Sequence, residues 1–321
     1  MSSPLRLVFF VIVSLTATAP ARGWNSAGHR LIAEIVWQHM NAGERRAASK
    51  LLKQHPHYRE LLTVHVPQEA DEGEWAFLTA AVWPDMVRPS WEGKTENIAR
   101  YDVFPHAVGY PFMRPDETNY ALIENFLIAK PDAEMVLSNA FVTLRNKGAI
   151  PHDRAVSLCW ALHLCGDLHQ PLHAADLVTK EHPHGENIGT HHIVLDDQGH
   201  PVAMHMFWDI LPGLDESYPA LAKMARAIAD DRKLARATRR ELEEDRTIAS
   251  WVQESFCVAV GFAYEGGRLQ FVYDADVNAG KVKPEQIPKL SDRYIAAAHE
   301  VARERMFLAG QRLLTELHQS W

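Results

Sequence analysis

The chain has 321 residues, of which 47% are hydrophobic and 23% charged, values typical of a globular protein with a large core. Its formal net charge of −8 opposes binding to duplex DNA through a basic face, because a phosphate backbone is bound by lysine and arginine. Beyond the first 23 residues, no apolar run approaches the roughly 20 residues that a membrane-spanning helix needs. We therefore expect a soluble protein without a membrane anchor.

The first 23 residues have the layout of a secretory signal. Arg6 is a short positive region, residues 7–15 are apolar, and Ala21-Arg22-Gly23 is a small-x-small cleavage site. We therefore expect an exported protein, periplasmic or secreted, with about 298 residues (321 − 23) and a net charge of about −10 (31 basic against 41 acidic residues). Cleavage after Gly23 would give Trp24 a free α-amine, which could bind a metal together with its carbonyl and His29. The alternative is that His29 simply begins a helix.

Hydrophobic periodicity predicts a mainly α chain. We expect helices at residues 28–40, 44–54, 120–129, 132–147, 153–168, 221–244, 247–263 and 292–317. Loops are expected at residues 88–96, 180–189 and 198–201, and a small hairpin at residues 193–195 and 201–204. No repeat or composition break divides the chain, so we expect one domain over residues 24–321. The three cysteines do not describe a disulfide scaffold and are expected to be buried free thiols.

The strongest motif lies at the end of the predicted helix 153–168. His163 and Asp167 are four residues apart and share a helix face, and Pro171 then lets His173 turn back toward that face. Such nitrogen and oxygen ligands suit zinc, although an isolated pair of this kind is more often a structural or surface hydrogen bond. His205 and Asp209 repeat the spacing among Met, Phe and Trp, where polar groups are costly to bury unless something satisfies them.

Two further groups follow aromatic-proline pairs: Asp85 after Trp83-Pro84, and His106 after Phe104-Pro105. Either residue alone would be unremarkable, and His106 alone would be interpreted as a hydrogen-bonded core histidine. Together with the two motifs and the Trp24 terminus they make a set of nine ligand-type groups. That number is sufficient for more than one metal ion.

The complete pattern resembles the zinc-dependent single-strand nucleases of class I, nuclease P-one and nuclease S-one. The resemblance runs to the C-terminus and is carried by Trp24 with His29, His163-x3-Asp167-x5-His173 with its Gln170-Pro171-Leu172 insert, the loop His184-Gly185-Glu186-Asn187, His205 with Trp208-Asp209, and the segment Leu308–Leu313. It implies a compact helical domain with the fold that these nucleases share with zinc phospholipase C. The absence of the usual disulfides and glycosylation sequons indicates a bacterial member.

The resemblance implies three zinc ions per chain. One would be held by Asp85, His106, His163 and Asp167; a close second by the Trp24 amine and carbonyl, His29 and Asp167; and a third by His173, His205 and Asp209.

Two close metal ions can share a hydroxide and lower the pKa of its parent water. The hypothesis is that this hydroxide attacks phosphorus in line, while the third zinc stabilises the departing 3′ oxygen. Single-stranded DNA and RNA would then give 5′-phosphate products, and 3′-nucleotidase activity is a further expectation. Asp85 and Asp167 would be catalytic, and Arg88, where the family has an arginine near the phosphate, would neutralise developing charge. From the residues alone, a surface salt bridge is an equal alternative for Arg88.

One segment departs from the family. The fungal enzymes hold a nucleobase with an aromatic residue and an aspartate, where this chain has Ala107 and Gly109. Neither side chain can stack on a base or bond to it, so base preference does not transfer. Tyr110 or Phe112 could replace the missing contacts, although a packing role is the simpler expectation.

Two other functions remain open from the sequence. A zinc phospholipase C acting on phosphocholine diesters also begins its mature chain at tryptophan, but the Gln-Pro-Leu-His element and the Trp-Asp pair favour the nuclease. A non-catalytic exported zinc-binding protein is the second alternative, although the 13 histidines outside the five proposed ligands form no exposed tract. We expect a monomer with a single-stranded nucleic acid or nucleotide as its substrate.

Overall fold

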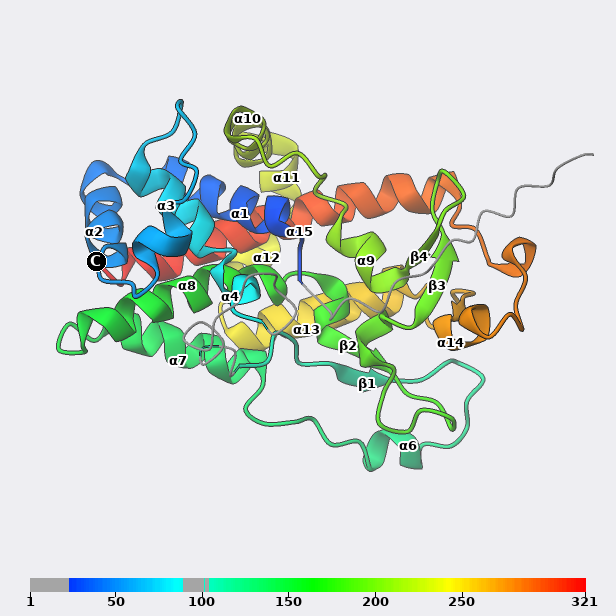
Figure 1. Ribbon diagram of the computed structural model, residues 1–321. Helices are drawn as coiled ribbons and strands as arrows, with labels where there is room; N and C mark the ends of the chain where they lie inside the picture. The colour runs from blue at the N-terminus through cyan, green and yellow to red at the C-terminus, as the bar shows by residue number, and fades with distance from the viewer. Residues whose placement is uncertain (1–22, 89–100, 102–103) are drawn as a thin grey trace, which may run out of the picture.

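The computed structural model describes residues 23–88, 101 and 104–321. Figure 1 shows a mainly helical molecule in which α1, α8 and α15 lie together at the centre. The longer described helices are α1 (Ser26–His39), α2 (Ala42–Leu52), α3 (Glu72–Ala80), α7 (Ala133–Arg145), α8 (Pro151–Asp167), α10 (Tyr218–Ala229), α13 (Ile248–Val258) and α15 (Asp292–His318). No helix among the described residues is long and apolar enough to cross a bilayer. The prediction of a mainly α fold is confirmed.

Short helical turns connect these elements. The α-helical ones are α4 (Trp83–Met86), α6 (Ala121–Glu124), α9 (Met204–Asp209), α11 (Arg232–Ala237), α12 (Arg239–Glu244) and α14 (Asp274–Asn278). The π-helical turns are η1 (Tyr58–Leu62) and η4 (Ala259–Ala263), and the 3₁₀ turns are η2 (Pro171–Ala174), η3 (Asn187–Gly189) and η5 (Pro284–Gln286).

Helix α8 is the central element of the core. Its side chains are buried almost without interruption from Leu158 to Asp167, as expected for a helix packed on all sides. It contacts α7, α15 and α1. Pro151 starts the helix at a position where no backbone N–H is needed, and Pro171 prevents its continuation. The helix therefore delivers its last turn, with His163 and Asp167, into the middle of the molecule.

The strands form two small sheets. β3 (His192–Leu195) pairs antiparallel with β4 (Pro201–Ala203), with Ile193 opposite Ala203, which confirms the predicted hairpin. β5 (Val272–Tyr273) adds to the other edge of β3. β1 (Tyr110–Phe112) pairs in parallel with β2 (Ala175–Leu177), a pairing that the sequence did not predict.

Several predicted helices differ in extent. The segment 120–129 is helical only over α6, because its apolar residues do not share a buried face and Leu127 is 90% exposed. The segment 221–244 is divided into α10, α11 and α12, since Asp231 caps a new helix by accepting the amides of Lys233 and Leu234. The last turn of the segment 247–263 is π-helical.

Other expectations have mixed outcomes. Most of the predicted loop 88–96 lies outside the described residues, whereas the loop 180–189 is present and contains the turn η3. Cys159 and Cys165 are buried free thiols as expected, but Cys257 is exposed, because it lies on the solvent side of α13.

Candidate metal centre

The eight predicted ligand side chains come together in three buried clusters. In each cluster one potential ligand atom per residue lies within 4.8 Å of the others. The clusters are His29 with His163 and Asp167; Asp85 with His106 and His163; and His173 with His205 and Asp209. All of these side chains are at most 8% exposed. The third cluster matches its predicted ligand set, whereas the first two clusters share His163 and not Asp167, which the prediction placed in both sets.

Different elements supply these groups. The first turn of α1 carries His29, and the last turn of α8 carries His163 and Asp167. The remaining groups are Asp85 on α4, His106 before β1, His173 on η2, and His205 with Asp209 on α9. The amide of Asn25 donates to the carbonyl of Asp209 at 3.0 Å, which ties the start of α1 to the end of α9.

Asp167 faces two clusters with its two oxygens. Oδ1 lies 3.3 Å from Nε2 of His29, whereas Oδ2 lies 3.1 Å from Nε2 of His163 and 3.1 Å from Nδ1 of His106. The facing nitrogens of His163 and His106 are only 2.8 Å apart. This arrangement is what a carboxylate that bridges two cations requires.

Residue 23 lies directly against the first cluster. A Cβ atom added to Gly23 would lie 1.5 Å from Oδ1 of Asp167 and 3.2 Å from Nε2 of His29, so a side chain there would clash. Gly23 is bonded to the backbone nitrogen of Trp24, whose side chain is fully buried. The structure therefore brings the Trp24 backbone to the cluster in which the sequence predicts its amine.

Several polar atoms of the clusters make no hydrogen bond although they are buried. They are both ring nitrogens of His29, Oδ1 of Asp85, Oδ1 of Asp167 and Oδ2 of Asp209. Leaving such an atom unsatisfied costs about 1–3 kcal/mol each, and more when it is charged. Buried nitrogen and carboxylate donors that converge without partners fit a bound cation, and this donor set suits zinc.

The second ring nitrogen of most of the clustered histidines is already bonded. Nδ1 of His163, His173 and His205 lies 2.8, 2.6 and 2.9 Å from the carbonyl oxygens of Ala81, His106 and Ile188, respectively. A carbonyl can only accept, so each Nδ1 carries the proton and each Nε2 presents its lone pair to a cluster. Metal-binding histidines have this arrangement in most known sites.

Charge within the clusters also favours a cation. Burial alone would raise the pKa of Asp167, but the imidazoles of His163 and His173 outweigh it and hold the pKa well below its usual value. Burial lowers the pKa of His106 to about 4, which leaves the ring neutral and able to act as a ligand. At Asp209, burial raises the pKa well above its usual value, and the nearby carboxylates of Asp167 and Asp85 add to the effect.

Arg88 belongs to the centre and is only 8% exposed, so the surface salt bridge considered for it is wrong. Its Nε lies 3.1 Å from Oδ1 of Asp85 and donates to Nε2 of His106 at 3.2 Å. Because Nε2 accepts this bond, a neutral His106 carries its proton on Nδ1, which lies 3.1 Å from Oδ2 of Asp167. Arg88 thus contacts two residues of the second cluster, Asp85 and His106.

Some contributors were not identified as such in the sequence. The side chain of Gln170 donates to Oδ1 of Asp209 at 2.8 Å, and its place in the Gln-Pro-Leu insert was the only signal for it. The indole of Trp83 donates to Nδ1 of His57 at 3.0 Å and so anchors the turn that carries Asp85. The carbonyls that orient the histidines carry no sequence signal, because every residue has one.

The departure from the family at residues 107–109 has a structural counterpart. Gly109 has a left-handed φ of 63°, a conformation that most side chains disfavour. Tyr110 packs on Phe256 and its hydroxyl reaches Glu134 at 3.5 Å, while Phe112 is buried against Tyr264. Both aromatic rings thus pack within the protein, as the simpler expectation held.

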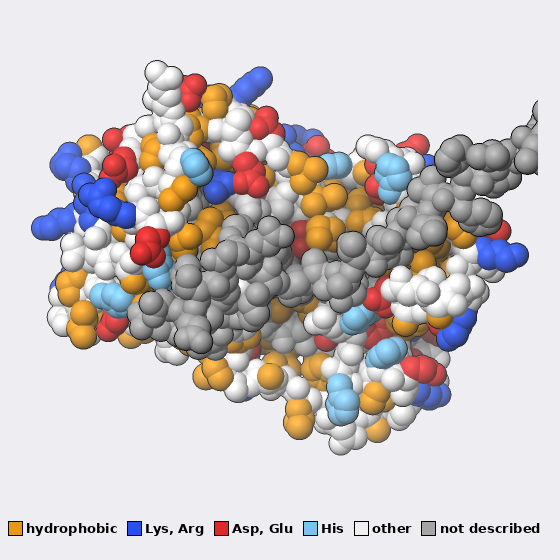
Figure 2. All heavy atoms as spheres, in the orientation of Figure 1, with side chains coloured by type: hydrophobic (Ala, Val, Ile, Leu, Met, Phe, Trp, Pro, Cys, Tyr) orange, Lys and Arg blue, Asp and Glu red, His pale blue; other side chains and the backbone are white. Residues whose placement is uncertain are grey.

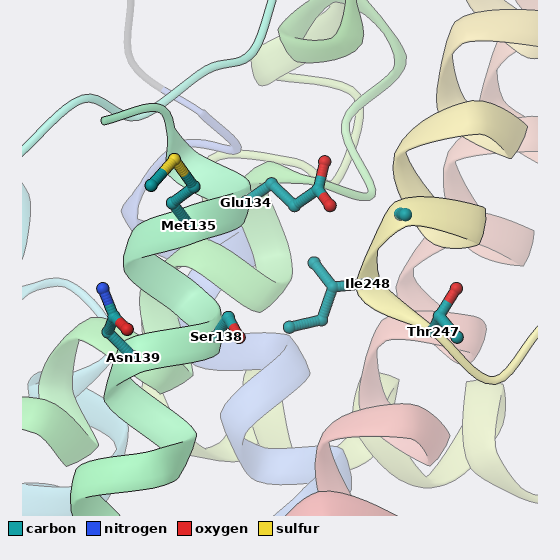
Figure 3. Close-up of a pocket in the computed structure, with 7 residues that line it drawn as sticks. Glu134, Met135, Ser138, Asn139, Thr247 and Ile248 are labelled. Carbon is teal, nitrogen blue, oxygen red and sulfur yellow. The ribbon is translucent and has the colours of Figure 1, made fainter. Parts of the chain in front are cut away.

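A separate surface pocket lies between α7 and the start of α13 (Figure 3). Its volume is about 400 Å³, and the side chains that line it include Glu134, Met135, Ser138, Asn139 and Ile248. Among the described residues that line it, Glu134 is the only ligand-type side chain and none is a histidine. This pocket therefore does not replace the three clusters as a candidate site.

The surface charge agrees with the composition. On the face shown in Figure 2, lysine and arginine lie at the edges and are interspersed with acidic side chains. They do not gather into one basic strip on this face.

Comparison with known proteins agrees with this geometry. Residues 24–321 match the family described as S1/P1 Nuclease. Among curated proteins, the chain is similar to Endonuclease 1 of Arabidopsis thaliana, with 25% identity over 225 residues, which cover 68% of this chain and 63% of the plant protein. The chain thus aligns with less than two thirds of the length of that relative. Because the family match covers the whole segment that carries the nine ligand-type groups, the chain belongs to the S1/P1 nuclease family.

Proposed function

We propose that this protein is a zinc-dependent phosphodiesterase that hydrolyses single-stranded DNA and RNA to products with 5′-phosphates. The observation that carries the proposal is the convergence of eight buried ligand side chains, together with the Trp24 backbone, in a member of a nuclease family. Three zinc ions per chain fit the three clusters, and 3′-nucleotidase activity fits the same chemistry. Bound zinc would supply the Lewis acidity that activates water and neutralises a phosphate.

The residues of the chain have separable tasks in this proposal. Asp167 would contribute to both of the first two zinc positions, because one of its oxygens lies near His29 and the other near His163. Asp85 and Arg88 lie together beside His106, so the guanidinium would place positive charge near a phosphate that binds at this cluster. The carbonyls behind His163, His173 and His205 keep each lone pair directed inward.

The buried position of the clusters favours a flexible substrate. A phosphate must descend to ligand atoms that are at most 8% exposed, which a single strand does more readily than a stiff duplex. The small side chains at Ala107 and Gly109 offer no base-specific hydrogen bond. We therefore propose weak base preference at this position.

Parallel assays test the proposal. Purified protein that begins at Trp24 is given single-stranded DNA, single-stranded RNA, a 3′-nucleotide and a phosphocholine diester, each with and without a chelator. We expect chelator-sensitive cleavage of the single strands. Turnover of the lipid diester alone would favour a phospholipase C, and bound zinc without any turnover would favour a non-catalytic zinc-binding protein.

The proposed site of action is outside the cytoplasm, in the periplasm or the medium, with the protein as a monomer. The layout of residues 1–23 supports export, and the need for a free Trp24 amine fits a leader that is removed. Fractionation of the producing cell, with N-terminal sequencing of the mature chain, tests both points. A cytoplasmic chain that retains residue 1 would contradict them.

A further inference from the structure

The turn that follows β2 has an unusual backbone. Asn187, Ile188 and Gly189 have successive positive φ angles of 52°, 51° and 84°. A β-branched residue in the left-handed region is a genuine outlier, and it persists only where the surrounding structure holds it. Ile188 nevertheless lies here with a side chain only 6% exposed. Something in the surrounding structure must hold it.

Asp176 holds this turn. Its Oδ1 accepts the amide of Glu186 at 2.8 Å and the amide of Ile188 at 3.0 Å, and both bonds are buried. Burial raises the pKa of Asp176 to about 6, so the carboxylate is still the main form at neutral pH. Gly185 allows the approach, because a Cβ added there would lie 2.3 Å from Oδ2 of Asp176.

A second anchor acts from the other side of the turn. The carboxylate of Glu186 bonds to the ring of His192 on β3 and accepts the hydroxyl of Tyr273 on β5 at 2.9 Å. Residue 186 is therefore fixed to the three-stranded sheet, and Asp176 fixes residues 186–188 to β2. The turn is determined from both sides, as a strained segment requires.

The strained residue has one contact with the metal centre. The carbonyl of Ile188 accepts from Nδ1 of His205 at 2.9 Å, which turns Nε2 of His205 toward the third cluster, 3.5 Å from Oδ2 of Asp209. The direction of that carbonyl depends on the left-handed conformation of Ile188. Asp176 itself is not among the residues of the three clusters.

We propose that Asp176 is a positioning residue for the third metal position, acting through the left-handed turn at Ile188 and the carbonyl that orients His205. The proposal rests on the proposed function in so far as it assumes that a metal binds His173, His205 and Asp209. Loss of a partner behind a ligating histidine typically lowers metal affinity about 10–100-fold. The other two clusters should be unaffected, because His163 is bonded to the carbonyl of Ala81 and His106 to Arg88, neither of which belongs to the turn at Ile188.

The test measures zinc binding in Asp176→Ala, Asp176→Asn and a matched control. Asp231→Ala is the control, because Asp231 also accepts two backbone amides, at 2.8 and 3.2 Å, but caps α11 instead. We expect Asp176→Ala to bind one of three zinc ions at least about 10-fold more weakly than the wild type. Asp176→Asn should retain that ion, because its amide oxygen can still accept both N–H groups, and Asp231→Ala should retain all three.

A double variant addresses the turn itself. Glycine adopts the left-handed conformation at no steric cost, so Ile188→Gly should partly restore zinc binding in Asp176→Ala. Unchanged zinc affinities in Asp176→Ala would overturn the proposal. So would equal weakening of all three ions, which would indicate a general folding defect.

Imidazole ¹⁵N spectra of the zinc-free protein separate this inference from the proposed function. In the wild type we expect His205 to carry its proton on Nδ1, and in Asp176→Ala we expect a mixture of tautomers. If the wild type binds no zinc at the third cluster, the proposed function fails, whereas the spectra still decide whether Asp176 positions His205. Identical spectra in the two proteins would contradict the positioning role.

Discussion

At the scale of single residues, the proposed metal site depends most on Asp167. One of its oxygens lies near His29 and the other near His163 and His106, so it is the carboxylate that links two ligand sets. We predict that Asp167→Asn, which removes the charge and one acceptor oxygen, lowers the rate on single-stranded DNA by at least about 100-fold and reduces bound zinc. The matched control is Asp274→Asn, which alters an aspartate paired with His191 outside the clusters. A native rate in Asp167→Asn would refute the shared-carboxylate arrangement.

Arg88 allows a second test at the scale of a residue. A lysine keeps the positive charge but loses the planar fork that reaches both Asp85 and His106. We predict that Arg88→Lys lowers kcat by roughly 100-fold and leaves zinc content near the wild-type value, because removing one hydrogen-bond donor to a transition state has an effect of this size. The conservative change Arg240→Lys, in a surface pair with Glu244, serves as control. An unchanged kcat in Arg88→Lys would show that Arg88 does not take part in catalysis.

At the scale of elements, the sequence predicted α1, α2, α7, α8 and α15 to within two residues at each end, whereas α3 was not predicted and the segment 221–244 was wrongly predicted as one helix. Helix α8 is one example, since its apolar residues, Pro151 and Pro171 all act locally. The parallel pairing of β1 with β2 could not be predicted, because Tyr110 and Ala175 are far apart in the chain and each strand is only three residues long. The burial of Arg88 depends on contacts with other segments and was likewise beyond reach.

The candidate site was more predictable than the fold that surrounds it. Side chains that can bind a metal are recognised by their residue type, so His163, Asp167 and their partners could be named from spacing and resemblance. The groups that orient them are mostly backbone carbonyls, such as those of Ala81 and Ile188, which leave no trace in residue type. Glu34, buried at the interface of α1 with α3 and α10, also gave no signal.

Glu34 predicts a pH dependence of stability. Burial, opposed by the hydrogen bond from Gln38 and reinforced by Glu74, raises the pKa of Glu34 to about 7. The folded state then binds this proton more tightly than the unfolded state, so the contribution is present below pH 4.5 and is lost as pH rises through about 7.

We expect the zinc-free wild type to lose on the order of 1–3 kcal/mol of unfolding free energy between pH 5 and pH 8 relative to Glu34→Gln. Urea unfolding at the two pH values measures the difference. The exposed change Glu285→Gln serves as control and should follow the wild type. Parallel pH profiles for the wild type and Glu34→Gln would contradict the assignment.

At the scale of the whole molecule, the metal centre joins segments from both halves of the chain. The first turn of α1, the last turn of α8 and the short helix α9 meet there, and α1 is tied to α9 through Asn25 and Asp209. The backbone before α1 lies against Asp167 and His29, where the proposed amine ligand has to be. In the proposal, the metal centre therefore needs both a fully folded chain and a free α-amine at Trp24.

This coupling predicts an effect of processing. A protein that retains Gly23 and residues before it has an amide in place of the amine, and it fills space beside Asp167. We expect such a protein to bind less zinc and to cleave single strands at least about 10-fold more slowly than a protein that begins at Trp24. Removal of the extra residues by a specific protease should restore both quantities. Full zinc and full activity before removal would show that the Trp24 amine is not a ligand.

The most direct measurement of the central claim is the zinc content of the protein that begins at Trp24, determined on the same sample as its activity on single-stranded DNA. The account predicts three zinc ions per chain, loss of cleavage when a chelator removes them, and recovery of cleavage when zinc is returned. Full cleavage by protein from which all metal has been removed would contradict it.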